Sequence, residues 1–195
     1  ALLTAERPVI VCGGGVVLAG ACAELADLVE TTGIPVCTTV SGQGSLAESH
    51  PLCAGVVGSN GGQPATRALV DDADCVFYIG CRAGSVTAER WRSPVPGGVV
   101  LHLDNDPAVI GACYETTAAI VADARIALVD LSLALEDRTF RPTNGAQRVA
   151  KAKEEKWAAF RTLAASDTAP ILPERVIADL RAALPDDAII CADPG

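Results

Sequence analysis

Three consecutive glycines near the start of the chain are the residues with the clearest capacity for binding chemistry. Gly13, Gly14 and Gly15 follow the apolar run Val9–Cys12 and precede a stretch with helical periodicity, Ala19–Thr31. At such a junction, backbone N–H groups and the N-terminus of a helix can receive a phosphate. A tight turn that lets the strand pack against the helix explains the same glycines equally well. Both interpretations stay open at this point.

The glycines do not complete the usual dinucleotide fingerprint. Leu18 stands where the third glycine of G-x-G-x-x-G belongs. That fingerprint also requires an acidic residue about 20 residues further on, at the end of the second strand. The second predicted strand instead runs into "CTTVSGQG", which has no carboxylate. A standard nicotinamide-dinucleotide site is therefore not predicted.

Charged side chains follow two later apolar runs. Arg82 comes shortly after Cys75–Ile79, and Asp104 and Asn105 come directly after Val99–Leu103. In open α/β sheets the carboxyl ends of the strands line the ligand crevice. A guanidinium there pairs with a phosphate or forms a surface ion pair, and both remain open for Arg82. We expect Asp104 to accept hydrogen bonds from ribose hydroxyls.

The elements that must position these residues are short apolar runs alternating with helical segments. Because the runs are apolar throughout, they predict parallel strands buried on both faces. Alternation of strand and helix with right-handed crossovers predicts an open, doubly wound α/β/α sheet. The six predicted strands are Val9–Cys12, Val36–Val40, Ala54–Val57, Cys75–Ile79, Val99–Leu103 and Ala119–Ala122. The predicted helices are Ala19–Thr31, Gln63–Val70, a short helix from Pro107 capped by Asp106, and Arg125–Leu135.

The character of the chain changes after residue 136. Residues 137–170 are charged and predict a linker with a solvated helix, whereas residues 171–195 predict a helix from Pro173 and a strand at Ala188–Cys191. We therefore divide the chain into 1–136, 137–170 and 171–195, the last being the truncated beginning of a further domain. The first residue is Ala1 and no methionine occurs, so we expect a processed chain or a piece of a longer one.

The composition excludes several classes of partner. The net charge is −9, from 24 acidic and 15 basic residues without a basic cluster, so no nucleic-acid binding is expected. No apolar run has the length of a membrane span. The eight cysteines form no C-x-x-C pair, which favours free thiols in a reducing cytoplasm over a metal site or disulfides.

Four segments, in this order, carry a resemblance to a known family. They are the stretch from "RPVIVCGGGVVLAG" to "LCAGVVG", then "ADCVFYIGCRAG", "HLDNDPAVIG" and "IVADAR". Over roughly residues 5–135 the chain resembles the central domain of thiamine-diphosphate enzymes of the acetolactate synthase type. The resemblance implies a six-stranded parallel Rossmann-like sheet of order 3-2-1-4-5-6. Such a domain holds FAD in acetolactate synthases, ADP in oxalyl-CoA decarboxylases, and no nucleotide in many relatives.

The resemblance also implies a set of nucleotide contacts. Carried over by position, they are Gly13, Gly14, Gly15, Thr39, Gly80, Arg82, Asp104, Asn105 and Asp123. The chain departs from acetolactate synthases at Ala83-Gly84-Ser85, where these usually have an aromatic residue and two aspartates. This departure weakens the FAD assignment and the assignment to acetolactate synthesis in particular.

The parent enzyme that the resemblance implies is cytoplasmic, and a homodimer or homotetramer. It would use thiamine diphosphate and Mg²⁺ to decarboxylate 2-oxo acids and to ligate the products. Residues 171–195 resemble the opening of the family's diphosphate-binding domain, whose first strand runs into Asp193-Pro194-Gly195. The family's catalytic glutamate and its G-D-G metal motif do not occur in this sequence, so we expect no thiamine chemistry, no catalytic residue and no metal site from the chain alone. The alternative is a stand-alone nucleotide-binding or structural module without catalysis.

Overall fold

The computed structural model of the protein describes residues 1–191. The chain forms two compact units, residues 1–153 and residues 154–195, and each is treated by itself below. The predicted division at residues 136 and 170 remains a prediction. The turn expected at Asp193–Gly195 lies outside the described residues.

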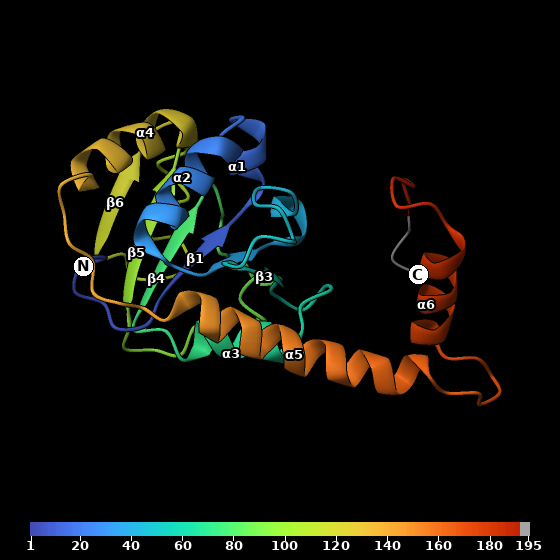
Figure 1. Cartoon of the computed structure of the whole chain (residues 1–195). Helices are drawn as coiled ribbons and strands as arrows, with labels where there is room; N and C mark the ends of the chain where they lie inside the picture. Colours follow the sequence, from blue (N-terminus) through green and yellow to red (C-terminus); the bar gives the residue numbers. More distant parts are fainter. Residues whose placement is uncertain (192–195) are drawn as a thin grey trace. The chain divides into compact units, whose positions relative to one another are not determined.

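The first unit is built on a single parallel sheet. Its strands are β1 (Pro8–Cys12), β2 (Val36–Thr38), β3 (Cys53–Val56), β4 (Cys75–Ile79), β5 (Val99–Asp104) and β6 (Ala118–Val121). Their order is β3-β2-β1-β4-β5-β6, which confirms the predicted fold class and strand order (Figure 1). The chain reverses its direction of winding between β1 and β4, so the loops after these two strands diverge and leave a crevice between them.

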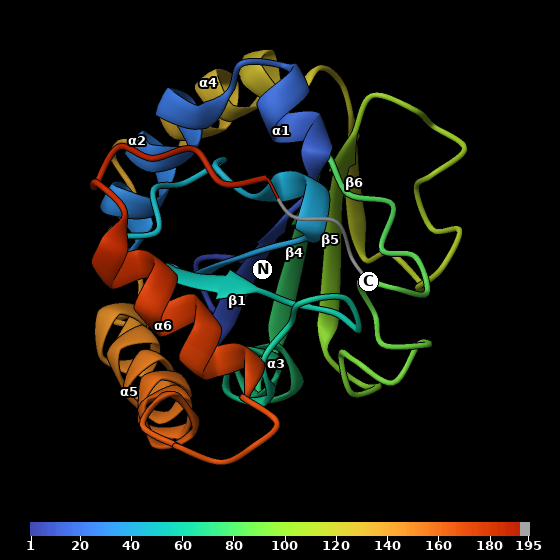
Figure 2. The same ribbon diagram turned by 90° about the vertical axis from the view of Figure 1, so that its right-hand side faces the viewer.

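Helices cover both faces of this sheet (Figures 1 and 2). One layer contains α1 (Gly14–Leu18), α2 (Cys22–Thr32) and α4 (Ala124–Leu135), and the other contains α3 (Pro64–Asp71) and the first part of α5 (Gly145–Ala164). Side chains of β1 alternate between the two layers, because successive residues of a strand point to opposite faces. Ile10 packs with the first layer, whereas Val9 and Val11 pack with the second.

Two helical predictions are corrected. The helix expected at Ala19–Thr31 is α2 and begins only at Cys22, because Gly20 adopts a φ of +63° and separates it from the short helix α1 that precedes it. The short helix expected to begin at Pro107 does not form. There the carboxylate of Asp106 accepts a hydrogen bond from Ala108 N at 2.9 Å, but the chain makes only isolated turns before Gly111, whose φ is +73°. A left-handed residue so soon after the start leaves no room for a stable helix.

Three strand predictions also need correction. β2 ends at Thr38 rather than Val40, because Thr39 instead caps a short 3₁₀ helix, η1 (Val40–Gly42). All four residues of β6 are exposed, since this strand is the edge of the sheet and is not covered on both faces. Residues 188–191 form no strand, because the described part of their unit offers no neighbouring strand to pair with.

The second unit continues α5 and then carries α6 (Pro173–Ala183). This helix begins at Pro173 as expected, and Pro is well tolerated in the first turn because its missing N–H has no partner there. Val176, Ile177 and Leu180 remain exposed on it. Among the described residues, no helix combines the length and the hydropathy required to cross a membrane.

Asp74 ties the N-terminal segment to the sheet and makes stability depend on pH. Partial burial alone would raise the pKa of Asp74, but its carboxylate accepts hydrogen bonds from Glu6 N at 2.7 Å and Arg7 N at 2.9 Å, and the net pKa lies below its ordinary value. A lowered pKa stabilises the fold above the unfolded value, about 3.9, and this contribution is lost as the pH falls through the folded value. We expect Asp74→Asn to lower the free energy of unfolding at pH 7 and to flatten its decline below pH 4. Urea titrations at a series of pH values measure this, and an unchanged pH profile would contradict it.

Candidate functional site

The carboxyl ends of five strands enclose a crevice in the first unit. Residues that follow β1, β2, β3 and β4, together with the last residue of β5, line a cavity of about 550 Å³. A second cavity of about 180 Å³ extends it toward the start of α4. Both are lined by Gly15, Leu18, Gly80 and Asp104, so they adjoin one another.

All nine residues carried over from the family resemblance lie along this crevice. The larger cavity is lined by Gly13, Gly14, Gly15, Thr39, Gly80, Arg82 and Asp104. The smaller one adds Asn105 and Asp123. The structure therefore brings these residues together from five segments of the chain, and their role as ligands of a nucleotide stays a prediction.

Two of the three glycines are required by backbone packing. A Cβ on Gly13 would lie 2.1 Å from Gly80 O, and a Cβ on Gly15 would lie 2.7 Å from Gly80 Cα. Two backbone hydrogen bonds support the same conclusion, because Gly13 N donates to Ile79 O at 2.9 Å and Gly15 N donates to Gly80 O at 3.0 Å. Gly80 itself has a φ of +55°, which favours glycine. The turns after β1 and β4 thus lock together backbone against backbone.

Gly14 differs from its two neighbours. Its amide makes neither of the contacts to the β4 turn, and it lies in the first turn of α1, where N–H groups have no acceptor within the helix. A Cβ here would meet Ser41 Cβ at 3.2 Å, across the crevice. Of the three glycines, Gly14 is the one positioned to present an amide to a ligand.

Side chains of opposite charge line the crevice. Arg82 is exposed and forms no ion pair with any other residue described. Asp104 lies where the two cavities adjoin, and Asp123 lines only the smaller one. One oxygen of Asp104 accepts from Asp106 N at 3.0 Å, and one oxygen of Asp123 accepts from Arg125 N at 2.9 Å, so each carboxylate keeps its second oxygen for another donor.

Thr39 has mainly a structural role at the crevice. Its hydroxyl is largely buried and accepts from Gly42 N at 3.1 Å, which fixes the short helix η1. The turn of η1 then sets Ser41 on the wall of the larger cavity. Sequence reasoning missed Ser41, Ser85 and Thr87 as polar lining residues. Ser41 directly follows the predicted strand Val36–Val40, and a hydroxyl side chain at that place was the available signal for it.

The thiol and imidazole beside the crevice do not provide a nucleophile or a base. Burial raises the pKa of Cys81 to about 11, so it remains a thiol at neutral pH. His102 is buried within β5, and its Nε2 lies 2.8 Å from Cys81 O, as expected for a core histidine. None of the eight cysteines forms a disulfide within the described residues.

The described residues do not fit a thiamine-diphosphate site. That cofactor is held through Mg²⁺, which takes oxygen ligands in near-octahedral geometry. Within residues 1–191, no group of three or more histidine, cysteine, aspartate or glutamate side chains could hold a metal ion. We therefore derive no thiamine step from these residues.

Together, the sheet order and the crevice define a doubly wound α/β domain of the Rossmann-like class. Residues 1–131 match the family described as "Thiamine pyrophosphate enzyme, central domain". The chain belongs to this family.

Several curated proteins are similar to the chain. A probable acetolactate synthase large subunit of Methanococcus aeolicus is 33% identical, covering 100% of this chain and 34% of that protein. Another, of Methanocaldococcus jannaschii, is 44% identical over 67% of this chain and 22% of its own length. A glyoxylate carboligase of Escherichia coli O157:H7 is 32% identical over 95% of this chain and 32% of that protein. The chain thus spans about a third or less of the length of these relatives.

Proposed function

We propose that this chain is the central domain of an enzyme that uses thiamine diphosphate and Mg²⁺ to decarboxylate 2-oxo acids and ligate the product. Family membership supports the cofactor, and relatives named for acetolactate synthesis and glyoxylate carboligation support the substrate class. The remaining domains, cytoplasmic location and dimeric or tetrameric assembly are part of the same proposal. Its test is thiamine-diphosphate-dependent consumption of pyruvate or glyoxylate by the full-length gene product. No turnover of any 2-oxo acid would refute it.

The second part of the proposal is that the crevice binds an ADP moiety, as ADP itself or as part of FAD. The observation that carries it is the convergence of Gly14, Arg82, Asp104 and Asp123 on two adjoining cavities. A diphosphate fits the guanidinium and the Gly14 amide. Ribose hydroxyls are donors that fit the two carboxylates.

ADP is the better fit of the two. The residues that line the two cavities include no aromatic side chain against which a flavin ring could stack. Residues 83–85, which carry bulkier or acidic side chains in acetolactate synthases, are Ala, Gly and Ser here. The absorbance spectrum of the purified protein tests this choice, because bound FAD absorbs visible light and ADP does not.

A purely structural domain is the competing function. The packing of Gly13 and Gly15 against the β4 turn favours it, because that packing explains two of the three glycines without any ligand. Calorimetric titration of the purified chain with ADP separates the two functions. Heat of binding supports the nucleotide site, and no binding at millimolar ADP supports the structural domain.

Gly14→Val is the most direct test of the phosphate position. The new side chain would press on Ser41 and fill the part of the crevice where the Gly14 amide is presented. We expect the ADP affinity to fall at least tenfold, about 1.4 kcal/mol, with the fold retained. Gly98→Val is the matched control, since its Cβ is similarly crowded, 3.3 Å from Ala73 O, but Gly98 does not line the crevice. Equal affinity in wild type and Gly14→Val would place the phosphate elsewhere.

A further inference from the structure

The wall of the crevice that carries Arg82 belongs to a loop with an unusual backbone. Residues 82–87 line the larger cavity, and the same loop then passes through Glu89, Arg90 and Trp91. These three residues have φ values of +47°, +59° and +59°. Left-handed backbone is disfavoured for side-chain-bearing residues, and a run of three persists only where surrounding contacts hold it.

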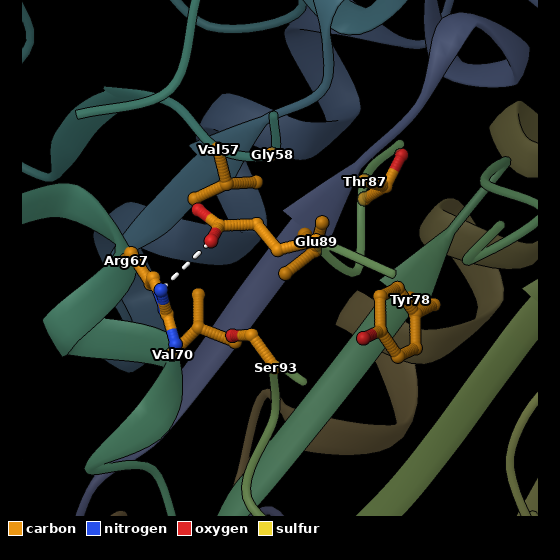
Figure 3. A pocket seen from close by; sticks show the side chains of 9 residues that line it. Val57, Gly58, Arg67, Val70, Tyr78, Thr87, Glu89 and Ser93 are labelled. Carbon is orange, nitrogen blue, oxygen red and sulfur yellow. Dashed lines mark hydrogen bonds and ion pairs between the residues drawn. The ribbon is translucent and has the colours of Figure 1, made fainter. Parts of the chain in front are cut away.

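An ion pair holds this strained segment. Glu89 Oε2 lies 2.8 Å from Nη1 of Arg67 on α3, and their side chains are only 16% and 34% exposed. Nε of the same guanidinium lies 3.0 Å from Asp71, one turn further along α3. Figure 3 shows Glu89 reaching toward Arg67 beside Tyr78, Thr87 and Ser93. The space between them is about 10 Å³, roughly one water molecule.

The ion pair is connected to the crevice wall through short hydrogen bonds. Ala88 N donates to Gly84 O at 2.9 Å, and Arg90 N donates to Ser85 O at 2.6 Å. Gly84 and Ser85 both line the crevice. A displacement of Glu89 would therefore be transmitted to the segment that follows Arg82.

A second contact fixes the same segment from the side of β3. Ser59 N donates to Val86 O at 2.9 Å. Gly58 packs directly beneath, because a Cβ on it would lie 2.5 Å from Val86 O. This contact holds the middle of the wall, and the Arg67–Glu89 pair attaches the segment that follows to α3.

We propose that the Arg67–Glu89 ion pair is a positioning device that holds the Arg82 wall of the crevice in its binding conformation before a ligand arrives. The proposal rests on the nucleotide site proposed above. Removing the Glu89 charge leaves the half-buried Arg67 without its partner on the loop and frees a strained segment to relax. Ligand binding must then restore the wall. The apparent affinity is therefore the intrinsic affinity multiplied by the fraction of molecules in which the wall is already formed.

The test compares Glu89→Gln with Asp71→Asn. Both replace an acid by its amide and remove an ion pair with the same guanidinium, but only Glu89 belongs to the loop. We expect Glu89→Gln to weaken ADP binding about tenfold and to speed hydrogen exchange of the Ala88 and Arg90 amides. Asp71→Asn should change the affinity less than threefold.

The outcomes distinguish an ion pair that positions the crevice wall from one that only stabilises the fold. Equal losses in Glu89→Gln and Asp71→Asn would overturn the proposal. So would unchanged exchange of the Ala88 and Arg90 amides in Glu89→Gln. If the wild-type chain binds no ADP, the nucleotide site fails, and faster exchange in Glu89→Gln alone still supports the ion pair as the device that holds the loop.

Discussion

Gly13→Ala is expected to destabilise the protein by about 3 kcal/mol or more, at the upper end of what added volume costs in a packed interior. The backbone angles of Gly13 suit any residue, with a φ of −99°, so the cause is purely steric. The added Cβ would lie 2.1 Å from Gly80 O and 2.7 Å from Cys81 Cα, which are main-chain atoms that cannot rotate away. The turns after β1 and β4 would have to separate, and these turns line the crevice.

Urea denaturation followed by circular dichroism measures this loss, and thermal unfolding should show a fall in the midpoint of roughly 6–12 °C. Gly84→Ala is the control, because a Cβ on Gly84 meets nothing within 4 Å. Its stability should stay within about 0.5 kcal/mol of wild type. A Gly13→Ala variant as stable as Gly84→Ala would show that the two turns are not in contact.

Arg82→Ala is expected to weaken ADP binding by about 10- to 100-fold while leaving stability unchanged. A hydrogen bond to a charged group contributes about 1.5–3 kcal/mol, and Arg82 has no ion-pair partner among the described residues that would compete for it. Because the side chain is exposed, its removal leaves no buried group without a partner. The wild-type affinity should also decline with added salt more steeply than that of the variant.

Isothermal titration at low and high salt measures both effects. Arg138→Ala serves as the control, since it removes the same charge from an exposed position outside the crevice. A comparable loss in both variants would mean that net charge, not position, governs binding. Unchanged affinity in Arg82→Ala would remove the diphosphate from this end of the crevice.

Gly13→Ala tests how the crevice is built, whereas Arg82→Ala tests whether it binds a ligand. Gly13 and Gly15 are explained by packing, whereas Gly14 and Arg82 are free to meet a ligand. A domain of this family could therefore lose its nucleotide and keep its glycines. The presence of the triplet alone does not establish a bound cofactor, and the affinity measurements on Gly14 and Arg82 variants decide it.

The sequence by itself determined the sheet. Buried parallel strands are continuous apolar runs, and this pattern located all six strands to within two residues at each end. The family resemblance supplied the order of the strands and the nine crevice residues. The nine residues lie together because, in a parallel sheet, the residues that follow the strands all lie at the same edge.

Only the tertiary structure decided what depends on neighbours distant in sequence. The exposure of β6, the missing helix after Pro107 and the unpaired residues 188–191 all depend on which elements lie alongside, which no local pattern encodes. The separation of Gly14 from Gly13 and Gly15 depends on contact with Gly80, more than 60 residues away along the chain. The Arg67–Glu89 pair joins a helix to a loop with three left-handed residues, and nothing in "RALVDD" or "AERWRS" predicts it. Strain of that kind is tolerated only because packing elsewhere stabilises it, so it becomes visible only once the chain is folded.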